Sequence, residues 1–299
     1  MPRRPFFISQ MMSGSSTIGR RRFLKLTAAA VFAGGSAASA RAGTGNLLTA
    51  PIQLQGNWSY GEATLRVLTR VRAVDLSKLR LLSDRQPAIL LIENHREGPP
   101  AIWLHRDQPD TASIILNVGA ADWCKLAYQF GHELGHVLAN SWQFSAKPQP
   151  PTQWLEEALV EAFSIRGLRL LADSWEQSPP FAGDEAFAGE IRQYRANLFE
   201  TDKSDAVAGL TSDAASWFHR NREQLDAGHA VPRGPAILGI LAIYESGRPC
   251  IDDLGGLNRW PERTSLPIDD YVDRWKRSCT EIGTSGELPS RLEQLFGLA

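Results

Sequence analysis

Hydrophobic residues follow two different patterns along this chain, and the pattern changes near Gly119. Before this residue the apolar positions come in short runs, which turn-forming stretches at 97–100 and 107–110 separate. Short runs between turns are typical of strands and hairpins. After an initial helix over 62–71, we therefore predict a small antiparallel sheet built from the apolar runs at 79–82, 88–92, 101–104 and 113–118.

Beyond Gly119 the apolar residues recur at intervals of three and four, beginning with the stretch from Trp123 to Leu138. This spacing is typical of helices with one buried face. Residues 43–59 show little periodicity, so we expect a flexible lead-in and an ordered unit that starts near Tyr60. The fold class is α+β, with a sheet-rich part over 60–119 and a helical part over 120–299. Further helices are predicted at 152–173, 184–199, 214–225, 235–245, 268–279 and 288–296.

The first 42 residues carry seven basic side chains and no acidic one. The run Arg20-Arg21-Arg22-Phe23-Leu24-Lys25 precedes a short Ala-rich apolar stretch and then small residues that end in Ala38-Ser39-Ala40-Arg41-Ala42. This order resembles a bacterial twin-arginine signal peptide, which implies a partner in the twin-arginine export machinery and a periplasmic or secreted protein. The apolar run is shorter than the roughly 20 residues that span a bilayer, so we expect no permanent membrane anchor. A basic, disordered N-terminus is the alternative.

Composition and charge narrow the classes of function. Hydrophobic residues make up 43% and charged residues 22% of the chain, which is typical of a folded globular protein. All 33 acidic residues follow the basic N-terminal segment, so the remainder is net acidic and we expect no nucleic-acid partner. Three cysteines are present without metal-ligand spacing. We expect a disulfide between Cys250 and Cys279 and a buried thiol at Cys124.

The candidate chemistry lies at Gly131-His132-Glu133-Leu134-Gly135-His136, inside the helix predicted after Gly119. Histidines four residues apart share a helix face, with Cβ atoms about 5–6 Å apart, so both imidazoles can reach one metal ion. Glu133 can then act as the base without binding the metal. Chance produces this pattern with a probability on the order of one in a hundred. The alternative is a helix with two unrelated histidines, although Gly135 costs stability there unless a strand or a substrate approaches its backbone closely.

A catalytic zinc site takes three protein ligands, and the next predicted helix offers candidates for the third. Glu157 and Glu161 share a face of this helix, while Glu156 competes with Glu157 for the metal. Between the two helices lies Lys147-Pro148-Gln149-Pro150-Pro151, which cannot remain helical and can reverse the chain. An antiparallel helix pair is therefore expected. A solvated acidic helix face is the alternative reading of these glutamates.

The two motifs together resemble those of the gluzincins, zinc peptidases with a peptidase MA-like domain. In this family a helix with Trp-Leu-x-Glu-Gly-x-x-Glu follows His-Glu-x-x-His, and Trp154, Leu155 and Glu157 match it, with Ala158 in place of Gly. The resemblance covers about residues 113–167 and implies a zincin-like fold. It also implies that zinc is bound by His132, His136 and Glu157, that Glu161 orients a zinc-bound histidine, and that the substrate is a peptide or protein.

The same resemblance suggests how substrate is bound and activated. Residues 114–118 stand where these enzymes have an edge strand that pairs with peptide backbone, although an ordinary core strand is equally compatible. A donor to the developing oxyanion is expected downstream; His229 is the candidate, and His219 and Tyr244 compete with it. The predicted function is zinc-dependent hydrolysis of peptide bonds with Glu133 as general base. A non-catalytic zinc-binding envelope protein, or hydrolysis of another kind of amide, is the alternative.

Overall fold

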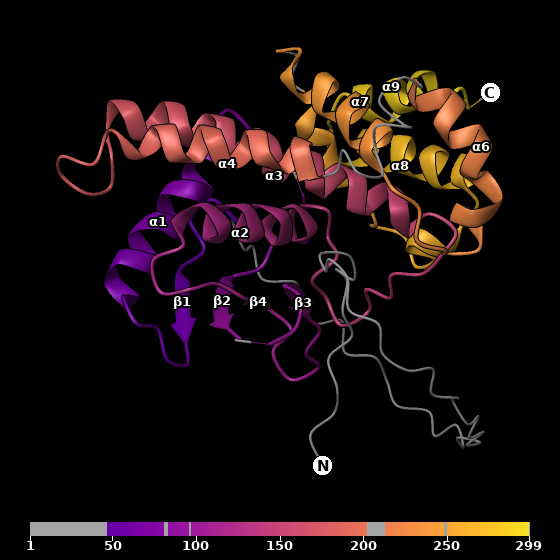
Figure 1. Ribbon diagram of the computed structural model, residues 1–299. Coiled ribbons are helices and arrows are strands. Elements are labelled where there is room, and N and C mark those ends of the chain that lie inside the picture. Colours follow the sequence, from indigo (N-terminus) through magenta and orange to yellow (C-terminus); the bar gives the residue numbers. More distant parts are fainter. Residues whose placement is uncertain (1–46, 81–82, 96, 202–212, 248–249, 299) are drawn as a thin grey trace, which may run out of the picture.

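The computed structural model describes residues 47–80, 83–95, 97–201, 213–247 and 250–298, which form an α+β structure with a small sheet at one end (Figure 1). The expected signal peptide, 1–42, lies outside these residues. The part that precedes the metal-motif helix contains β1 (Ile52–Gln55), α1 (Gly61–Asp75), β2 (Ile89–Asn94), β3 (Ala101–Trp103) and β4 (Thr111–Leu116).

The sheet is mixed, with the strand order β1-β2-β4-β3, so the prediction of an antiparallel sheet is wrong. β1 and β4 both run parallel to β2, and only β3 is antiparallel to its neighbour. The cause lies in α1, which connects β1 to β2 as a crossover helix, the connection that parallel strands require. Ile114 of β4 pairs with Ile92 on one side and Ile102 on the other. β4 is therefore an inner strand. The expectation of an edge strand at residues 114–118 is wrong for 114–116, which belong to β4.

Two further expectations about the first part of the chain need correction. Residues 52–55 belong to the sheet, and Leu47 is fully buried, so the ordered unit begins earlier than Tyr60. The apolar run at 79–82 forms no strand at Leu79 and Arg80, while 81 and 82 lie outside the described residues. Arg80 instead contacts Asp252 through its backbone and its guanidinium group. This segment connects the sheet-rich part with the helical part.

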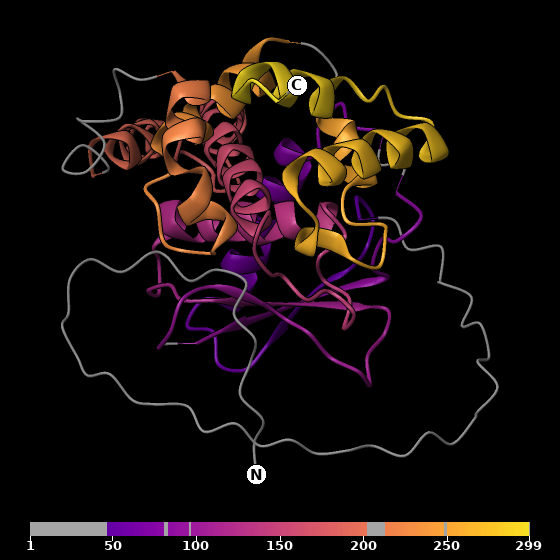
Figure 2. The ribbon, with the colours of Figure 1, turned by 90° about the vertical axis from the view of Figure 1, so that its right-hand side faces the viewer.

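All seven helices predicted after Gly119 are present. α2 lies over the sheet beside α1, and the long α3 with its partner α4 forms the next layer (Figure 1). The remaining helices gather around the first turns of α3, as the rotated view shows (Figure 2). Their bounds are α2 (Trp123–Leu138), α3 (Gln153–Gln177), α4 (Phe187–Thr201), α6 (Ala214–Asp226), α7 (Gly234–Glu245), α8 (Ile268–Ile282) and α9 (Glu287–Phe296), with short 3-10 helices η1 (Ile251–Gly256) and η2 (Arg263–Ser265).

α2 and α3 form the antiparallel pair that was predicted, and glycine allows them to approach closely. A Cβ atom at Gly135 would lie 2.9 Å from Cβ of Val160 on α3. Toward the start of α2, a Cβ at Gly131 would lie 3.2 Å from Oγ of Ser164, one turn further along α3. The neighbour that excludes a side chain at Gly135 is therefore a helix, and neither a strand nor a substrate.

The buried Asp75, the last residue of α1, is placed at the same helix pair. Its carboxylate lies against Gly131 of α2, and a Cβ atom at Gly167 of α3 would overlap Oδ1. Neither carboxylate oxygen has a hydrogen-bond partner. Burial raises the pKa of Asp75 well above its usual value, and the charge of Arg166 offsets this only in part. The end of α1 thus places a buried carboxyl group without a hydrogen-bond partner between α2 and α3.

The three cysteines are buried free thiols, so the expected disulfide between Cys250 and Cys279 is absent. Sγ of Cys279 faces η1, where a Cβ atom at Gly256 would lie 3.0 Å away, and burial raises its pKa to about 12. The buried thiol expected at Cys124 is confirmed. Among the described residues, no helix combines the length and apolar character needed to cross a bilayer.

Candidate metal centre

His132 and His136 lie on the same face of α2, one helical turn apart. Their ring centroids are 5.1 Å apart and their planes are inclined by 69°. Both side chains are buried, because α3 covers this face of α2. The Nε2 atom of each ring is buried and has no hydrogen-bond partner. The two Nε2 atoms are therefore buried without a hydrogen-bond partner. Burying a polar atom in this way costs free energy of folding unless a ligand binds it.

Glu157 of α3 faces both of these nitrogen atoms. One carboxylate oxygen lies 3.6 Å from Nε2 of His132, and the other lies 3.6 Å from Nε2 of His136. These distances are too long for hydrogen bonds, and Oε1 of Glu157 has no partner. The three side chains can offer ligand atoms that all lie within 4.8 Å of one another. His132, His136 and Glu157 thus form a buried group that could bind one metal ion.

A second carboxylate orients each histidine from the opposite side of its ring. Nδ1 of His132 lies 2.9 Å from Oε2 of Glu161, whose other oxygen accepts a hydrogen bond of 2.5 Å from the hydroxyl of Tyr128. Nδ1 of His136 lies 2.8 Å from Oε1 of Glu156. Since an ionised carboxylate only accepts hydrogen bonds, each Nδ1 carries the proton and each Nε2 faces Glu157.

The positions of these glutamates resolve the choice that the sequence left open. Glu156 was a rival of Glu157 for the metal, but its carboxylate lies on the Nδ1 side of His136, away from the position that both Nε2 atoms face. Glu161, expected to orient a histidine, contacts Nδ1 of His132. The three acids therefore have distinct places: Glu157 between the two Nε2 atoms, and Glu156 and Glu161 behind the rings.

Glu133 is fully buried, and neither of its carboxylate oxygens has a hydrogen-bond partner. Burial raises its pKa to about 7, although the neighbouring His132 and His136 lower it and Glu157 raises it further. An acid with this pKa can both accept and release a proton near neutral pH. Glu133 therefore has the environment that a proton-transfer group requires.

The charges of the site compensate one another through proton sharing. Burial alone would lower the pKa of His132, but Glu157 and Glu161 outweigh it and raise the pKa to about 10. Burial would raise the pKa of Glu157, but His132 and His136 lower it. A second proton, on Nε2 of either histidine, would occupy the place where a cation would sit, beside Glu157. A metal ion would replace this proton, so the donor set fits a cation in both charge and geometry.

Sequence reasoning missed three residues that belong to this centre. Tyr128 lies one turn before His132, and its spacing of four could have revealed it. Arg233 precedes α7, where its charge helps to lower the pKa values of the buried Glu157 and Glu161. A cation at a helix N-terminus is unfavourable because it opposes the helix dipole. An arginine in this position could therefore have marked Arg233 as a candidate functional residue. Asn258 donates a hydrogen bond of 2.8 Å to Glu156 from more than 100 residues away, so no local pattern could indicate it.

The expected oxyanion donors are not among these neighbours. His229 is exposed just before α7, and His219 lies on α6 near Gly297. Tyr244 is buried and its hydroxyl faces the backbone oxygen of Leu159 at 3.4 Å. Within the described ranges, none of the three forms a hydrogen bond or ion pair with His132, His136 or Glu157. The oxyanion role expected for His229 stays a prediction.

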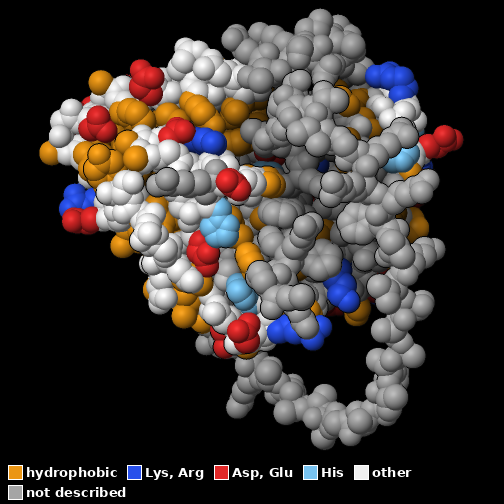
Figure 3. Space-filling model, turned by 60° about the horizontal axis from the view of Figure 1, so that its bottom comes forward, with side chains coloured by type: hydrophobic (Ala, Val, Ile, Leu, Met, Phe, Trp, Pro, Cys, Tyr) orange, Lys and Arg blue, Asp and Glu red, His pale blue; other side chains and the backbone are white. Residues whose placement is uncertain are grey.

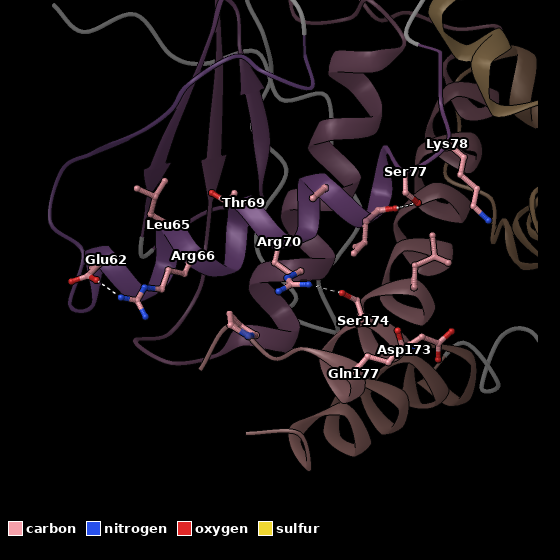
Figure 4. Close-up of a pocket in the computed structure, with 14 residues that line it drawn as sticks. Glu62, Leu65, Arg66, Thr69, Arg70, Ser77, Lys78, Asp173, Ser174 and Gln177 are labelled. Carbon is pink, nitrogen blue, oxygen red and sulfur yellow. Dashed lines mark hydrogen bonds and ion pairs between the residues drawn. The ribbon is translucent and has the colours of Figure 1, made fainter. Parts of the chain in front are cut away.

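A groove of about 930 Å³ lies apart from the candidate metal centre, between α1 and the second half of α3 (Figure 4). Two pairs of its polar residues contact each other: Arg66 pairs with Glu62, and Arg70 donates a hydrogen bond to Ser174. None of the candidate metal ligands lines it. On the face below the sheet, acidic, basic and hydrophobic side chains are interspersed over the described surface (Figure 3).

Comparisons with known proteins add no relative. No protein-family model matches the chain, and no curated protein or solved structure matches it. What is established is an α+β structure in which His132, His136 and Glu157 converge and could hold a metal ion.

Proposed function

We propose that this protein is a zinc-dependent peptidase of the gluzincin type, with a zincin-like fold. One observation carries the proposal. The side chains of His132, His136 and Glu157 turn unpartnered atoms toward a common point, and the equally unpartnered carboxylate of Glu133 lies on the same turn of α2. A buried helix pair that bound no ligand would gain stability by replacing these four polar side chains with apolar ones.

The donor set favours zinc among the common metal ions. Two imidazoles and one carboxylate are a frequent set of ligands in catalytic zinc sites, whereas Mg²⁺ and Ca²⁺ prefer oxygen ligands alone. Three protein ligands leave one coordination position for water or substrate. When bound, zinc supplies the Lewis acidity that lowers the pKa of water toward about 7 and polarises a carbonyl group.

The residues of this chain supply the proton transfers and the orientation. Glu133 accepts a proton from the attacking water and delivers it to the leaving amine, a role that suits its raised pKa. Glu161 and Glu156 hold the two imidazoles through Nδ1, so that each Nε2 stays available as a ligand. Tyr128 and Asn258 hold these two carboxylates in turn.

A peptide substrate can bind by adding a strand to the sheet. β3 lies at the end of the strand order and pairs only with β4 among the described strands. An extended chain would pair with the outer edge of β3 through backbone hydrogen bonds. β3 also packs near α2, the helix that carries His132 and His136. We therefore assign the substrate strand to β3 in place of the inner strand β4.

Export by the twin-arginine route belongs to the same proposal and rests on the sequence of residues 1–42 alone. This route carries folded proteins, which would allow the metal to be bound before export. Fractionation of cells that express the full chain, followed by N-terminal sequencing of the mature protein, tests it. Replacing Arg20, Arg21 and Arg22 by lysine should keep the protein in the cytoplasm. Unchanged export of that variant would contradict the assignment.

A second candidate is a non-catalytic zinc-binding protein, and the burial of the centre favours it. Only 6% of His132 and 5% of Glu157 is exposed, which is more typical of a structural site than of an open catalytic one. Against it stands Glu133, because a structural site requires no free acid beside its ligands. The two candidates differ in one measurable property, the cleavage of peptides.

The decisive experiment combines metal analysis with peptide cleavage. We expect the purified protein to hold one zinc ion per chain and to cut members of a peptide library, with products identified by mass spectrometry. Glu133→Gln should retain the zinc and lose turnover by at least about 100-fold. Glu176→Gln, on an exposed part of the same helix pair, is the matched control and should change neither. Zinc without any cleavage would favour the second candidate, and no metal binding would overturn both.

A further inference from the structure

A continuous chain of hydrogen bonds connects α8 with the candidate ligand His136. The hydroxyl of Tyr271 donates to Oδ1 of Asn258 at 3.0 Å, and Nδ2 of Asn258 donates to Oε2 of Glu156 at 2.8 Å. Oε1 of the same carboxylate lies 2.8 Å from Nδ1 of His136. All four side chains are buried, with no more than 1% of any residue exposed. In such surroundings hydrogen bonds are strong and their loss is costly.

The backbone conformation of Asn258 suits its place in this series of hydrogen bonds, and the surrounding loop holds the residue there. Its φ angle is 55°, in the left-handed region that Asn adopts more readily than most residues. The loop before it is fixed to the C-terminal end of α2, because Nδ2 of Asn140 donates to the backbone oxygens of Gly255 and Leu257. Arg263 in turn donates to the backbone oxygen of Asn140. The amide of Asn258 is therefore held at a defined place relative to His136.

The two histidines are supported in different ways. His132 depends on Glu161 and Tyr128, which lie on α3 and α2 and have sequence numbers close to its own. His136 depends on a residue of α3 and on two residues that follow η1. Among the described residues, the hydrogen bonds that reach the centre from positions after 257 are on the His136 side. This asymmetry predicts that changes after residue 257 act on one ligand and leave the other intact.

We propose that Asn258 and Tyr271 are positioning residues that fix the orientation of His136 through Glu156. This inference rests on the proposed metal centre but goes beyond the proposed activity, since it would hold for a non-catalytic zinc protein as well. The amide of Asn258 occupies the second oxygen of Glu156, so the first oxygen stays on Nδ1 of His136. Nε2 then points toward Glu157 with its lone pair available. Tyr271 prevents rotation of the amide by binding its oxygen atom.

The test uses variants that alter the hydrogen bonds between Tyr271, Asn258 and Glu156 without removing a candidate metal ligand. Asn258→Asp keeps the size, the left-handed backbone and the acceptor for Tyr271, but replaces the donor to Glu156 by an oxygen atom. We expect it to bind Zn²⁺ 10- to 100-fold more weakly in competition with a chelating dye, as for other outer contacts of metal-bound histidine. The visible absorption of the Co²⁺-loaded protein should shift as well. Asn258→Gly and Tyr271→Phe, which remove donors without adding charge, should weaken Zn²⁺ binding in the same direction.

Ser141→Ala is the matched control, because the Ser141 hydroxyl accepts a hydrogen bond of 3.0 Å from the same amide, while its bond to His136 is between backbone atoms that Ala retains. It should leave the Zn²⁺ affinity within about threefold of the unaltered protein and the Co²⁺ spectrum unchanged. If the unaltered protein binds zinc and Asn258→Asp, Asn258→Gly and Tyr271→Phe match it in affinity and spectrum, the positioning role is refuted while the metal centre stands. If the unaltered protein binds no metal, the proposed centre itself fails. If Asn258→Asp alone fails to fold, Asn258→Gly and Tyr271→Phe still test the positioning role.

Discussion

Gly135 and Val160 face each other where α2 and α3 cross, and a methyl group on Gly135 would lie only 2.9 Å from Cβ of Val160. Gly135 stands between the two histidines of the metal motif, one residue before His136. The distance between the helices at this point therefore decides whether Glu157 can reach both imidazoles. Gly135 lowers the local stability of α2, but it lets α3 approach closely enough for Glu157 to face both histidines.

The first prediction concerns this contact. Gly135→Ala should destabilise the protein by about 1–3 kcal/mol, because the added methyl group meets Val160 at an overpacked distance. It should also weaken zinc binding by separating α3 from the histidines. Urea unfolding and dye competition measure the two effects. Gly189→Ala on α4, where the added Cβ meets nothing within 4 Å, is the control and should stabilise by about 0.5–1 kcal/mol. Equal effects of both variants would contradict the prediction.

The second prediction concerns the pH dependence caused by Asp75. Its folded-state pKa is raised, so the folded protein keeps a proton that the unfolded chain releases. Stability should therefore fall as pH rises from the unfolded pKa toward the folded one, by about 1.4 kcal/mol per pH unit for this group. Asp75→Asn removes the titration, so its free energy of unfolding relative to the unaltered protein should increase with pH across this window. Urea unfolding between pH 4 and 8 measures it, and a constant difference would refute it.

The third prediction separates a ligand from an orienting acid. Glu157→Gln removes the charge between the two Nε2 atoms, whereas Glu156→Gln leaves these contacts intact and alters the bonds to Nδ1 of His136 and to Asn258. Glu156→Gln should weaken zinc binding about 10- to 100-fold. Glu157→Gln should weaken it at least about tenfold more, since it changes one of three ligands. Direct competition assays rank the two, and the reverse order would assign the ligand role to Glu156.

The fourth prediction concerns metal removal. The bound ion would satisfy buried atoms of α2 and α3 that otherwise have no partner, so it should stabilise the folded state. At a free zinc concentration 100 times the Kd, the gain is about 2.7 kcal/mol. Chelation should lower the unfolding temperature, and zinc should restore it. His132→Ala should abolish the response, while His95→Ala, at a half-buried site beside Glu93, should preserve it. A chelator-insensitive transition in the unaltered protein would argue against the centre.

The fifth prediction concerns Arg233, whose positive charge acts on Glu157 and Glu161. A cation close to the centre repels a metal ion, so Arg233→Gln should raise zinc affinity by about 2- to 10-fold, and the effect should shrink with added salt. Arg220→Gln, on an exposed position of α6, should have no effect. A lower affinity in Arg233→Gln would instead indicate that the arginine holds the site together.

Local patterns were sufficient to predict the helices after Gly119 and to single out His132 and His136 as candidate ligands. Apolar spacing located α2 and α3, and the proline-rich run between them predicted the reversal. The spacing of His132 and His136 follows from helix geometry alone. Glu156 and Glu157 could not be separated by pattern alone, because the choice depends on how α3 is rotated against α2.

Long-range relationships were beyond such patterns. The parallel pairing of β1 with β2 follows from the crossover through α1, and a short apolar run carries no information about its partner. Cys250 and Cys279 were expected to pair, yet both are free thiols and Cys279 packs against Gly256. Asn258 reaches Glu156 only because η1 folds back onto the end of α2.

Two consecutive residues of α3 contact His136 from different directions. Glu156 lies at Nδ1 of the ring, and Glu157 lies near Nε2. Neighbouring side chains on a helix diverge by about 100°, so this arrangement requires one rotational setting of α3. A twist of the helix about its axis would withdraw both acids at once. The centre therefore restricts the rotation of α3 about its own axis.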